Sequence, residues 1–285
     1  MKKSLLFIIG LFFTISLYAQ WGPQSKVLTD SVNSKILGMS RQFTIYLPAS
    51  YDVDASKTYP VLYLLHGLGG NAHTWPHAGH VRDVADLQIA NGESDEVIII
   101  SPDAGGTING YFNVEGWAYE DFFFKEFLPE VEKRYRIKAE KKYRAVAGFS
   151  MGGGGATVYA QRHPDMFCAA FAMSALMNVP AVGAVPSQRK GDPIDLLNSS
   201  VIERAADKFV DNADEATKNA LRTVAWYVDC GDDDFLFDRN IEFYQAMRRA
   251  YIPCQLRVRD GRHDFEYWHS SLYECLAFIS RCFGK

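Results

Sequence analysis

Short apolar runs, each too short to form a helix of its own, most restrict what this chain can fold into. Residues 61–65 and 97–100 contain no charged side chain, so strands formed by them would be buried on both faces. Similar runs recur along the chain at residues 43–47, 143–147, 167–173, 225–228 and 255–258. Helical patterns separate many of them, which predicts an α/β protein with a mostly parallel central sheet and helices on both faces.

Two of the intervening helices can be placed from their periodicity. Phe123, Phe127 and Val131 recur at four-residue spacing, so one face of that helix should pack on the sheet. Pro129 should kink this helix or mark a break in it. Residues 241–248 show a second helical pattern, which should end before Pro253.

The first residues have the composition of a signal peptide. Lys2 and Lys3 precede a nearly unbroken apolar run at residues 5–17, and the small residue Ala19 follows at the expected cleavage point. A membrane anchor is the alternative, but a spanning helix needs about 20 apolar residues and no stop-transfer charges follow this run. We therefore expect residues 1–19 to be removed from a secreted or periplasmic protein without stable membrane insertion.

The remaining residues, 20–285, should form one domain. They contain no repeat, low-complexity tract or linker that would divide them, and their length is ordinary for a single α/β domain. The formal charge of −4 comes from scattered residues of both signs, without a basic stripe or acidic tail. This pattern argues against nucleic acid or an anionic membrane as partner and favours a small molecule or a polymer surface.

Residues 178–222 are too long for an ordinary connection between two strands. They begin with a segment rich in proline, glycine and valine and continue with a charged helical pattern around residues 202–221. We expect a partial cap over a site, with a decorated crossover connection as the alternative.

The five cysteines give no indication of a metal site. They lie at positions 168, 230, 254, 275 and 282, and none forms a Cys-x-x-Cys pair, so neither a metal nor a cofactor is expected. An odd count leaves at least one thiol unpaired. Cys275 and Cys282 could share one face of a helix, although burial as small apolar residues is the favoured interpretation for most of the five.

The clearest chemical signal is a serine between glycines where a strand should meet a helix. The pentapeptide Gly148-Phe149-Ser150-Met151-Gly152 follows the run at residues 143–147 and precedes a helical pattern. A tight strand-to-helix turn needs small residues beside the serine, because neighbouring Cβ atoms would otherwise collide. The turn would also direct the following amides and the positive helix end at the serine oxygen. Ser150 is therefore the candidate nucleophile.

The candidate base follows from chain order. In an α/β-hydrolase, the fold typical of this turn, an acid and then a histidine follow the serine. Four histidines precede Ser150, and His163 lies on the helix that should follow it. His263 follows the last predicted strand in a turn that should open a helix, whereas His269 resembles a helix-surface residue. His263 is therefore the expected base.

The acid should lie on the turn after the preceding strand. Asp229 falls within that strand, and Asp232, Asp233 and Asp234 fall within the turn, so these residues alone leave the choice open. The carboxylates not used as the acid would be solvated at a helix start. A calcium loop is a further interpretation, but the alternating ligands and distal glutamate of an EF-hand are missing.

Two backbone amides should hold the oxyanion. The amide of Met151 follows the nucleophile, and a second should come from the glycine-rich loop His66-Gly67-Leu68-Gly69-Gly70. Leu68 is the expected second donor, and His66 should have a structural role.

Several motifs together resemble the putative-esterase or esterase-D family. The resemblance is carried by residues 65–70, 100–103, 148–153, 230–236 and 261–268, which span nearly the whole mature chain in the right order. This group includes feruloyl and acetyl xylan esterases of carbohydrate esterase family one, S-formylglutathione hydrolases and mycolyltransferases. The resemblance implies an α/β-hydrolase fold and assigns the acid, the last Asp of a Gly-x-x-Asp turn, to Asp234, with Asp233 next.

The resemblance also implies an ester substrate that enters beside Trp75 and Trp117; core or rim aromatics are the alternative. Export favours feruloyl or acetyl esters of plant polysaccharides over a cytosolic glutathione thioester. Residues 178–222 match nothing in the family pattern. Two other functions share the fold: an acyltransferase that uses the same triad on a sugar acceptor, and a non-catalytic carbohydrate-binding protein.

Overall fold

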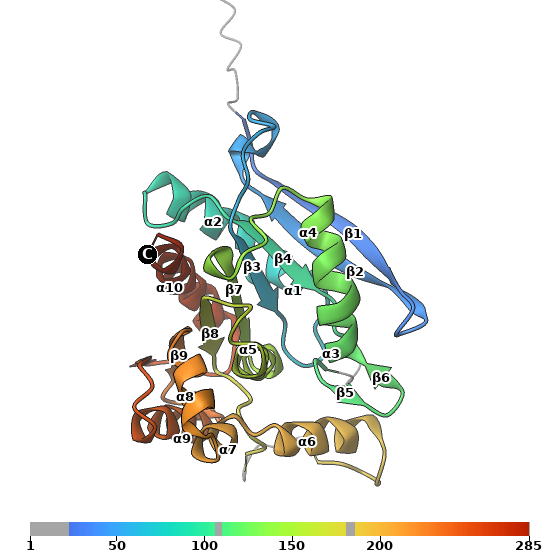
Figure 1. Ribbon diagram of the computed structural model, residues 1–285, viewed down its shortest axis with the longest axis vertical. Coiled ribbons are helices and arrows are strands. Elements are labelled where there is room, and N and C mark those ends of the chain that lie inside the picture. The colour runs from blue at the N-terminus through green and yellow to red at the C-terminus, as the bar shows by residue number, and fades with distance from the viewer. Residues whose placement is uncertain (1–22, 106–109, 181–185, 285) are drawn as a thin grey trace, which may run out of the picture.

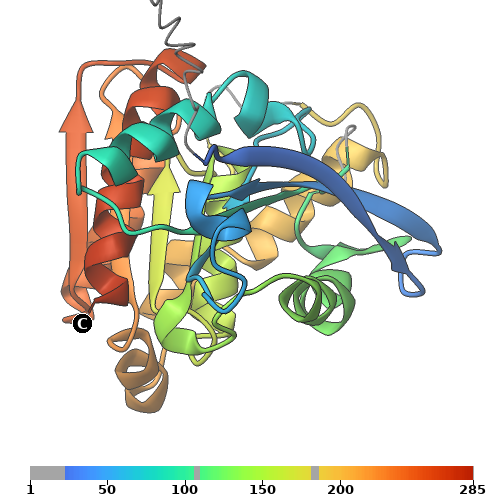
Figure 2. The ribbon, with the colours of Figure 1, turned by 90° about the horizontal axis from the view of Figure 1, so that it is seen from above.

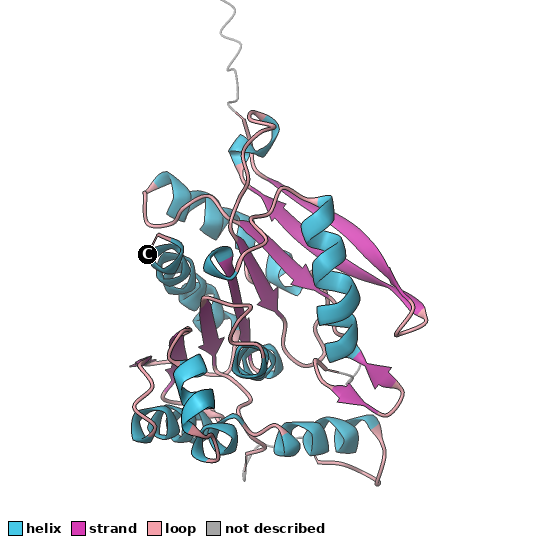
Figure 3. Cartoon of the chain, viewed as in Figure 1, coloured by secondary structure: helices cyan, strands magenta, loops and turns pink. Residues whose placement is uncertain are grey.

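The computed structural model describes residues 23–105, 110–180 and 186–284. An eight-stranded sheet runs through the described part of the chain in the order β1-β2-β4-β3-β7-β8-β9-β10, with helices on both faces (Figures 1 and 3). Neighbouring strands from β4 to β10 in this order are parallel. At the other edge of the sheet, β1 pairs antiparallel with β2, and β2 pairs antiparallel with β4. The predicted mostly parallel sheet is confirmed.

The strands lie close to the predicted runs. In the main sheet they are β1 (Lys26–Ser34), β2 (Met39–Leu47), β3 (Val61–Leu65), β4 (Ile98–Pro102), β7 (Arg144–Phe149), β8 (Ala169–Met173), β9 (Ala225–Gly231) and β10 (Cys254–Arg259). A separate hairpin consists of β5 (Asn113–Val114) and β6 (Trp117–Ala118). The sequence interpretation missed β1, because this edge strand is mostly exposed or half-buried and shows no apolar run.

The helices connect the strands as expected of crossover segments. They are α1 (Thr74–His77), α2 (Val81–Ala90), α3 (Tyr119–Phe122), α4 (Leu128–Arg134), α5 (Met151–Arg162), α6 (Pro193–Glu203), α7 (Ala206–Asp211), α8 (Glu215–Leu221), α9 (Phe237–Arg249) and α10 (Phe265–Phe283). A π-helical turn at Phe123–Phe127 joins α3 to α4. Pro129 lies in the first turn of α4, so the irregularity predicted near this proline falls directly before it.

Alternate side chains of the central strands enter two separate core layers. Leu62 and Leu64 of β3 belong to the layer that includes α2 and α10, whereas Val61, Tyr63 and Leu65 belong to the layer with α5 and α9. Figure 2 shows α2 and α10 on one face, and the long β1–β2 pair at the edge of the sheet, extending beyond its other strands. Burial on both faces explains why β3 is apolar throughout.

Two predicted segments lie partly or wholly outside the described residues. The expected signal peptide, residues 1–19, is outside them. Of the expected cap, residues 181–185 are outside them, and the rest carries α6, α7 and α8; α6 contacts the β5 strand, while α7 packs on α5 and α9. The cap stays a prediction. Among the described helices, none is both long and apolar enough to cross a membrane.

Candidate active site

Ser150 occupies a strained turn between β7 and α5. Its φ is 54° and its ψ is −122°, a conformation that non-glycine residues rarely adopt. The backbone is held on both sides: its amide donates to the Met173 carbonyl at 2.9 Å, and its carbonyl accepts from the amides of Leu176 at 2.8 Å and Gly154 at 3.1 Å. These bonds fix the turn that exposes the serine hydroxyl at the carboxyl edge of the sheet.

Close backbone packing explains the two flanking glycines. A Cβ on Gly148 would lie 2.5 Å from the carbonyl carbon and oxygen of Gly152. A Cβ on Gly152 would lie 2.5 Å from the backbone oxygens of both Leu65 and His66. Backbone atoms cannot rotate away as side chains do, so only glycine fits at these positions.

The structure brings Ser150, His263 and Asp234 together. His263 Nε2 lies 2.9 Å from Ser150 Oγ, and His263 Nδ1 lies 2.8 Å from Asp234 Oδ2 and 3.0 Å from Asp234 Oδ1. The Asp234 side chain is fully buried, and its Oδ1 also accepts from the Leu236 amide at 2.8 Å. With Asp234 as acceptor at Nδ1, the neutral imidazole carries its proton there and presents a free Nε2 lone pair to the serine.

Aromatic rings surround the His263 imidazole. Trp268, which is buried, meets it edge to face with ring centroids 4.9 Å apart, and Phe235 lies 4.5 Å from it on the acid loop. Asp264, the next residue, caps α10 by accepting from the Tyr267 amide at 3.0 Å. This cap fixes where the turn ends, and the buried Trp268 ring then limits how the imidazole can rotate.

The other carboxylates of the acid loop are placed elsewhere. Asp229 is buried in β9 and bonds to Arg257 and to the Tyr267 hydroxyl, at 2.5 and 2.6 Å. Asp232 and Asp233 are exposed and form a surface group with Asp260, whose carboxylate oxygens lie within 4.8 Å of one another. Asp232 accepts a bond from the Gly261 amide at 3.2 Å. Asp234, by contrast, is buried and bonds to His263.

The two expected oxyanion donors belong to different elements. The Met151 amide is the first of α5, so it has no carbonyl partner within the helix. Leu68 lies in the loop after β3 and is partly exposed.

The side chain of His66 anchors this loop. Its Nδ1 donates to the Gly67 carbonyl at 2.8 Å, and its Nε2 accepts from the Ala104 amide at 3.0 Å. Burial lowers the pKa of His66, which keeps the imidazole neutral and able to accept that bond. Tyr111 adds a bond from its hydroxyl to the His66 carbonyl at 2.9 Å.

Trp75 and Trp117 lie in the core, in contrast to the expected substrate contact. Trp75 is fully buried, donates its indole N–H to the Leu65 carbonyl at 3.1 Å and packs edge to face on Phe149. Trp117 is 6% exposed, donates to the Gly110 carbonyl at 2.9 Å and stacks on Tyr119. Both rings pack in the core, so the expected substrate contact is wrong and the core alternative holds.

Asn240 is a positioning residue that sequence reasoning missed. Its side chain is fully buried on α9 and bonds to both the amide and the carbonyl of Ala175, at 3.1 and 3.0 Å. It also donates to the Leu236 carbonyl at 2.9 Å. Asn240 thus ties the loop after β8, which supports Ser150, to the loop that carries Asp234. A lone asparagine within a helical pattern gives no sequence signal for this role.

The cysteines take no part in the site. Cys168, Cys230, Cys254 and Cys275 have free thiols. Burial raises the pKa of the Cys168 and Cys254 thiols to about 12, which keeps both protonated and unreactive.

A serine on a strained strand-to-helix turn, followed in chain order by an aspartate and a histidine on the loops after β9 and β10, defines an α/β-hydrolase. The family model described as Putative esterase matches residues 34–279. The chain therefore belongs to the putative-esterase family, which places it among the ester hydrolases.

Individual relatives agree with this membership. A ferulic acid esterase of known structure is 57% identical, with a TM-score of 0.90 and coverage of 92% of this chain and 99% of that one. The S-formylglutathione hydrolase of Staphylococcus aureus has a TM-score of 0.70 at 20% identity, covering 90% and 99%, a likeness in fold.

A curated relative matches a shorter stretch. The endo-1,4-beta-xylanase/feruloyl esterase of Xylanibacter ruminicola is 34% identical over 144 residues, which are 47% of this chain and 19% of that protein. The first curated relatives are matched over only 19% to 29% of their own length.

Proposed function

We propose that this chain is a secreted serine esterase that releases feruloyl or acetyl groups from plant polysaccharide esters. Ser150, His263 and Asp234 are its catalytic residues. The observation that carries the proposal is the continuous set of hydrogen bonds from Asp234 through His263 to the Ser150 hydroxyl, at 2.8 and 2.9 Å. A base in contact with a nucleophile, itself oriented by a buried acid, is the arrangement that acyl transfer needs.

The first step forms an acyl-enzyme. His263 Nε2 takes the proton of Ser150 Oγ while this oxygen attacks the ester carbonyl carbon. Asp234 holds the imidazole in the tautomer that accepts this proton and stabilises the imidazolium that forms. The protonated imidazole then gives the proton to the leaving alcohol oxygen, and the ester bond breaks.

The oxyanion formed in each step is held by the amides of Leu68 and Met151. The Met151 amide lies at the positive end of α5, which favours negative charge at this point. In the second step water attacks the acyl carbonyl carbon and gives a proton to His263. The bond between the acyl group and Ser150 Oγ then breaks, and His263 returns the proton to this oxygen, which leaves the free acid and the Ser150 hydroxyl.

The substrate class rests on likeness to other proteins and on the predicted signal peptide. The 57% identical protein is a ferulic acid esterase, and the Xylanibacter ruminicola relative combines a xylanase with a feruloyl esterase. A protein exported by the leader at residues 1–19 would meet polysaccharide esters rather than cytosolic thioesters. The partners proposed are therefore small or polysaccharide esters, without nucleic acid or a cofactor.

A hydrolysis panel with the Ser150→Ala variant tests the proposal. Methyl ferulate, acetylated xylan, p-nitrophenyl acetate and S-formylglutathione are compared as substrates. We expect the wild type to hydrolyse the first three, and Ser150→Ala to lower kcat by about 10⁴-fold or more. Ser56→Ala, at an exposed loop serine, is the control and should retain full activity.

Two results would overturn parts of the proposal. Full turnover of p-nitrophenyl acetate by Ser150→Ala would exclude Ser150 as the nucleophile. Product analysis with an added sugar acceptor separates hydrolysis from transfer: a dominant acyl-sugar product would identify an acyltransferase instead.

A further inference from the structure

Phe235 is an exposed aromatic ring beside the proposed base. It is 47% exposed, and it directly follows the buried Asp234 on the loop after β9. Single exposed apolar residues are common on protein surfaces and need no explanation by themselves. Phe235 differs from such residues because its ring centroid lies 4.5 Å from that of His263.

The backbone around Phe235 is fixed although its ring is exposed. The Leu236 amide donates to Asp234 Oδ1 at 2.8 Å, and the Phe237 amide donates to the Asp234 carbonyl at 2.9 Å. The ring is therefore presented to solvent from a rigid turn rather than from a loose loop. A ligand can stack on such a ring with little loss of conformational entropy in the protein.

His263 lies between a buried ring and an exposed one. Trp268, 5% exposed, contacts the imidazole from the interior, and Phe235 contacts it from the solvent side. The His263 side chain itself is 18% exposed. The exposed Phe235 ring therefore lies next to the imidazole that a substrate must reach from solvent.

The chemistry decides which part of an ester comes close to His263. The leaving alcohol oxygen must come within hydrogen-bond reach of Nε2 to receive its proton, so the carbons attached to that oxygen lie next to the imidazole. The acyl carbonyl oxygen lies instead between the amides of Leu68 and Met151. Leu68, 38% exposed, carries one of these amides, whereas Phe235, 47% exposed, lies beside the imidazole that gives its proton to the leaving group.

We propose that Phe235 is a specificity-determining residue that stacks on the sugar ring of the leaving alcohol. The proposal rests on the proposed function and names the part of the substrate that this loop recognises. The C–H face of a sugar ring is apolar and weakly positive, which suits the negative face of an aromatic ring. An ester of a small alcohol such as methanol has no ring to stack there.

The test compares two esters that share the acyl group and differ in the alcohol: methyl ferulate and a feruloylated arabinose. We expect Phe235→Ala to lower kcat/KM for the sugar ester by about three- to tenfold, mostly through KM, and to change that for methyl ferulate by less than about twofold. Phe235→Tyr keeps a ring and should behave as the wild type. If the wild type prefers acetyl esters, methyl acetate and acetylated xylose replace the pair.

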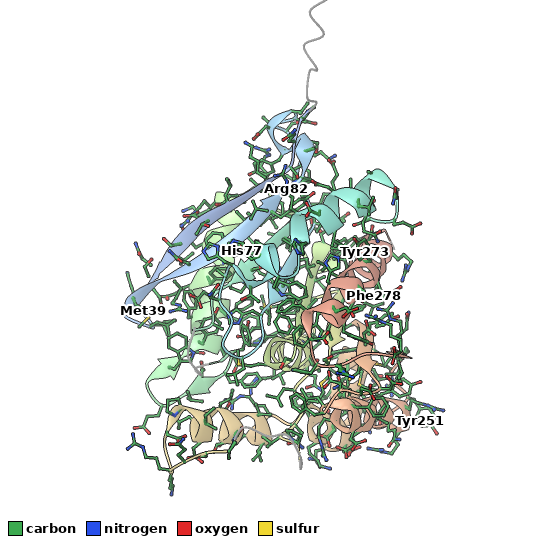
Figure 4. All side chains as sticks on the ribbon, turned by 180° about the vertical axis from the view of Figure 1, so that it is seen from behind. Met39, His77, Arg82, Tyr251, Tyr273 and Phe278 are labelled. Atoms are coloured by element: carbon green, nitrogen blue, oxygen red, sulfur yellow. The ribbon has the colours of Figure 1, made fainter. Side chains whose placement is uncertain are left out.

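Tyr251→Ala is the matched control, because Tyr251 is 85% exposed and precedes the amino end of β10, whereas His263 follows the carboxyl end of this strand. Figure 4 shows Tyr251 at the periphery of the molecule. It should affect neither ester. Equal losses on both esters in Phe235→Ala would show that the ring positions His263 or holds the acyl group, and no loss would show that the sugar does not touch it. Either result overturns the inference while the proposed function stands. A wild type that hydrolyses no ester at all overturns both.

Discussion

The two sides of the candidate site are built in different ways. On the nucleophile side, β7, Ser150 and α5 form one continuous stretch, and backbone contacts with Leu65, His66 and Met173 hold it. On the acid–base side, Asp234 and His263 come from separate loops, 29 residues apart, and their side chains bond to each other. The first side is fixed by packing that admits no larger residue, and the second by hydrogen bonds between side chains.

Because of this difference, substitutions on the two sides should affect the free energy of unfolding and the catalytic activity to different extents. A side chain added at Gly148 or Gly152 on the nucleophile side must displace backbone, so it should cost folding free energy as well as activity. A polar change on the acid–base side can keep the shape of the loop and remove only the function of one atom. The predictions below test this separation.

The largest effect is expected for Asp234→Asn. The amide keeps the size of the side chain but favours the wrong imidazole tautomer, with the proton on Nε2, so kcat should fall by about 10⁴-fold. The free energy of unfolding should change little, because the amide oxygen can still accept from the Leu236 amide. Steady-state kinetics and urea unfolding measure the two quantities.

Asp229→Asn, on β9 directly before the loop that carries Asp234, is the control. Asp229 is fully buried and balances the charge of Arg257, so losing its charge should lower the free energy of unfolding by about 2–3 kcal/mol. The folded variant should retain most of its activity. A 10⁴-fold loss of kcat in Asp229→Asn, with full activity in Asp234→Asn, would show that Asp229 and not Asp234 is the catalytic acid.

Gly152→Ala should affect stability and activity together. The added Cβ would lie 2.5 Å from the carbonyl oxygens of Leu65 and His66, so we expect a loss of about 1–3 kcal/mol and a displaced Met151 amide. Gly284→Ala, where the nearest atom would be 3.9 Å away, should change stability by less than about 0.5 kcal/mol. A Gly152→Ala variant with unchanged stability would show that the turn is loosely packed.

The sequence could predict the nucleophile side almost completely. Gly148, Ser150 and Gly152 lie within five residues of the chain. The steric reason for each glycine is the tight turn itself, so the sequence pattern predicts the turn. Chain order reduces the candidate bases to His263 and His269, and the position of His263 after the last predicted strand selects it. Asp234 could not be separated from Asp232 and Asp233 by local reasoning, because burial and contact with His263 depend on how two distant loops meet.

The misinterpreted and missed residues have separate physical causes. Trp75 and Trp117 were expected at the substrate surface, but aromatic residues near a site also fill the core beneath it, and sequence does not distinguish the two. Asn240 was missed because its role is a bond between two loops. The strand β1 was missed because edge strands need no apolar pattern.

The smallest effect is expected for His66, whose protonation should make the stability of the oxyanion loop depend on pH. Burial lowers the pKa of His66 below its ordinary value of 6.5, so the unfolded chain binds this proton more readily than the folded chain. Its contribution to stability is therefore complete above about pH 6.5 and is lost as the pH falls through the lowered pKa of the folded state. Protonation of Nε2 would also break the bond from the Ala104 amide.

Urea unfolding between pH 5 and pH 8 measures this contribution. We expect the stability of the wild type to fall below about pH 6.5 and that of His66→Gln to fall less steeply, from a lower starting value. His163→Gln is the control, because burial also lowers the pKa of His163 but this residue lies at the far end of α5. Both variants should flatten the pH dependence of stability, yet only His66→Gln should lower kcat, since only His66 anchors the loop that carries the Leu68 amide. Equal kcat values for both variants would show that the loop holds its shape without the imidazole.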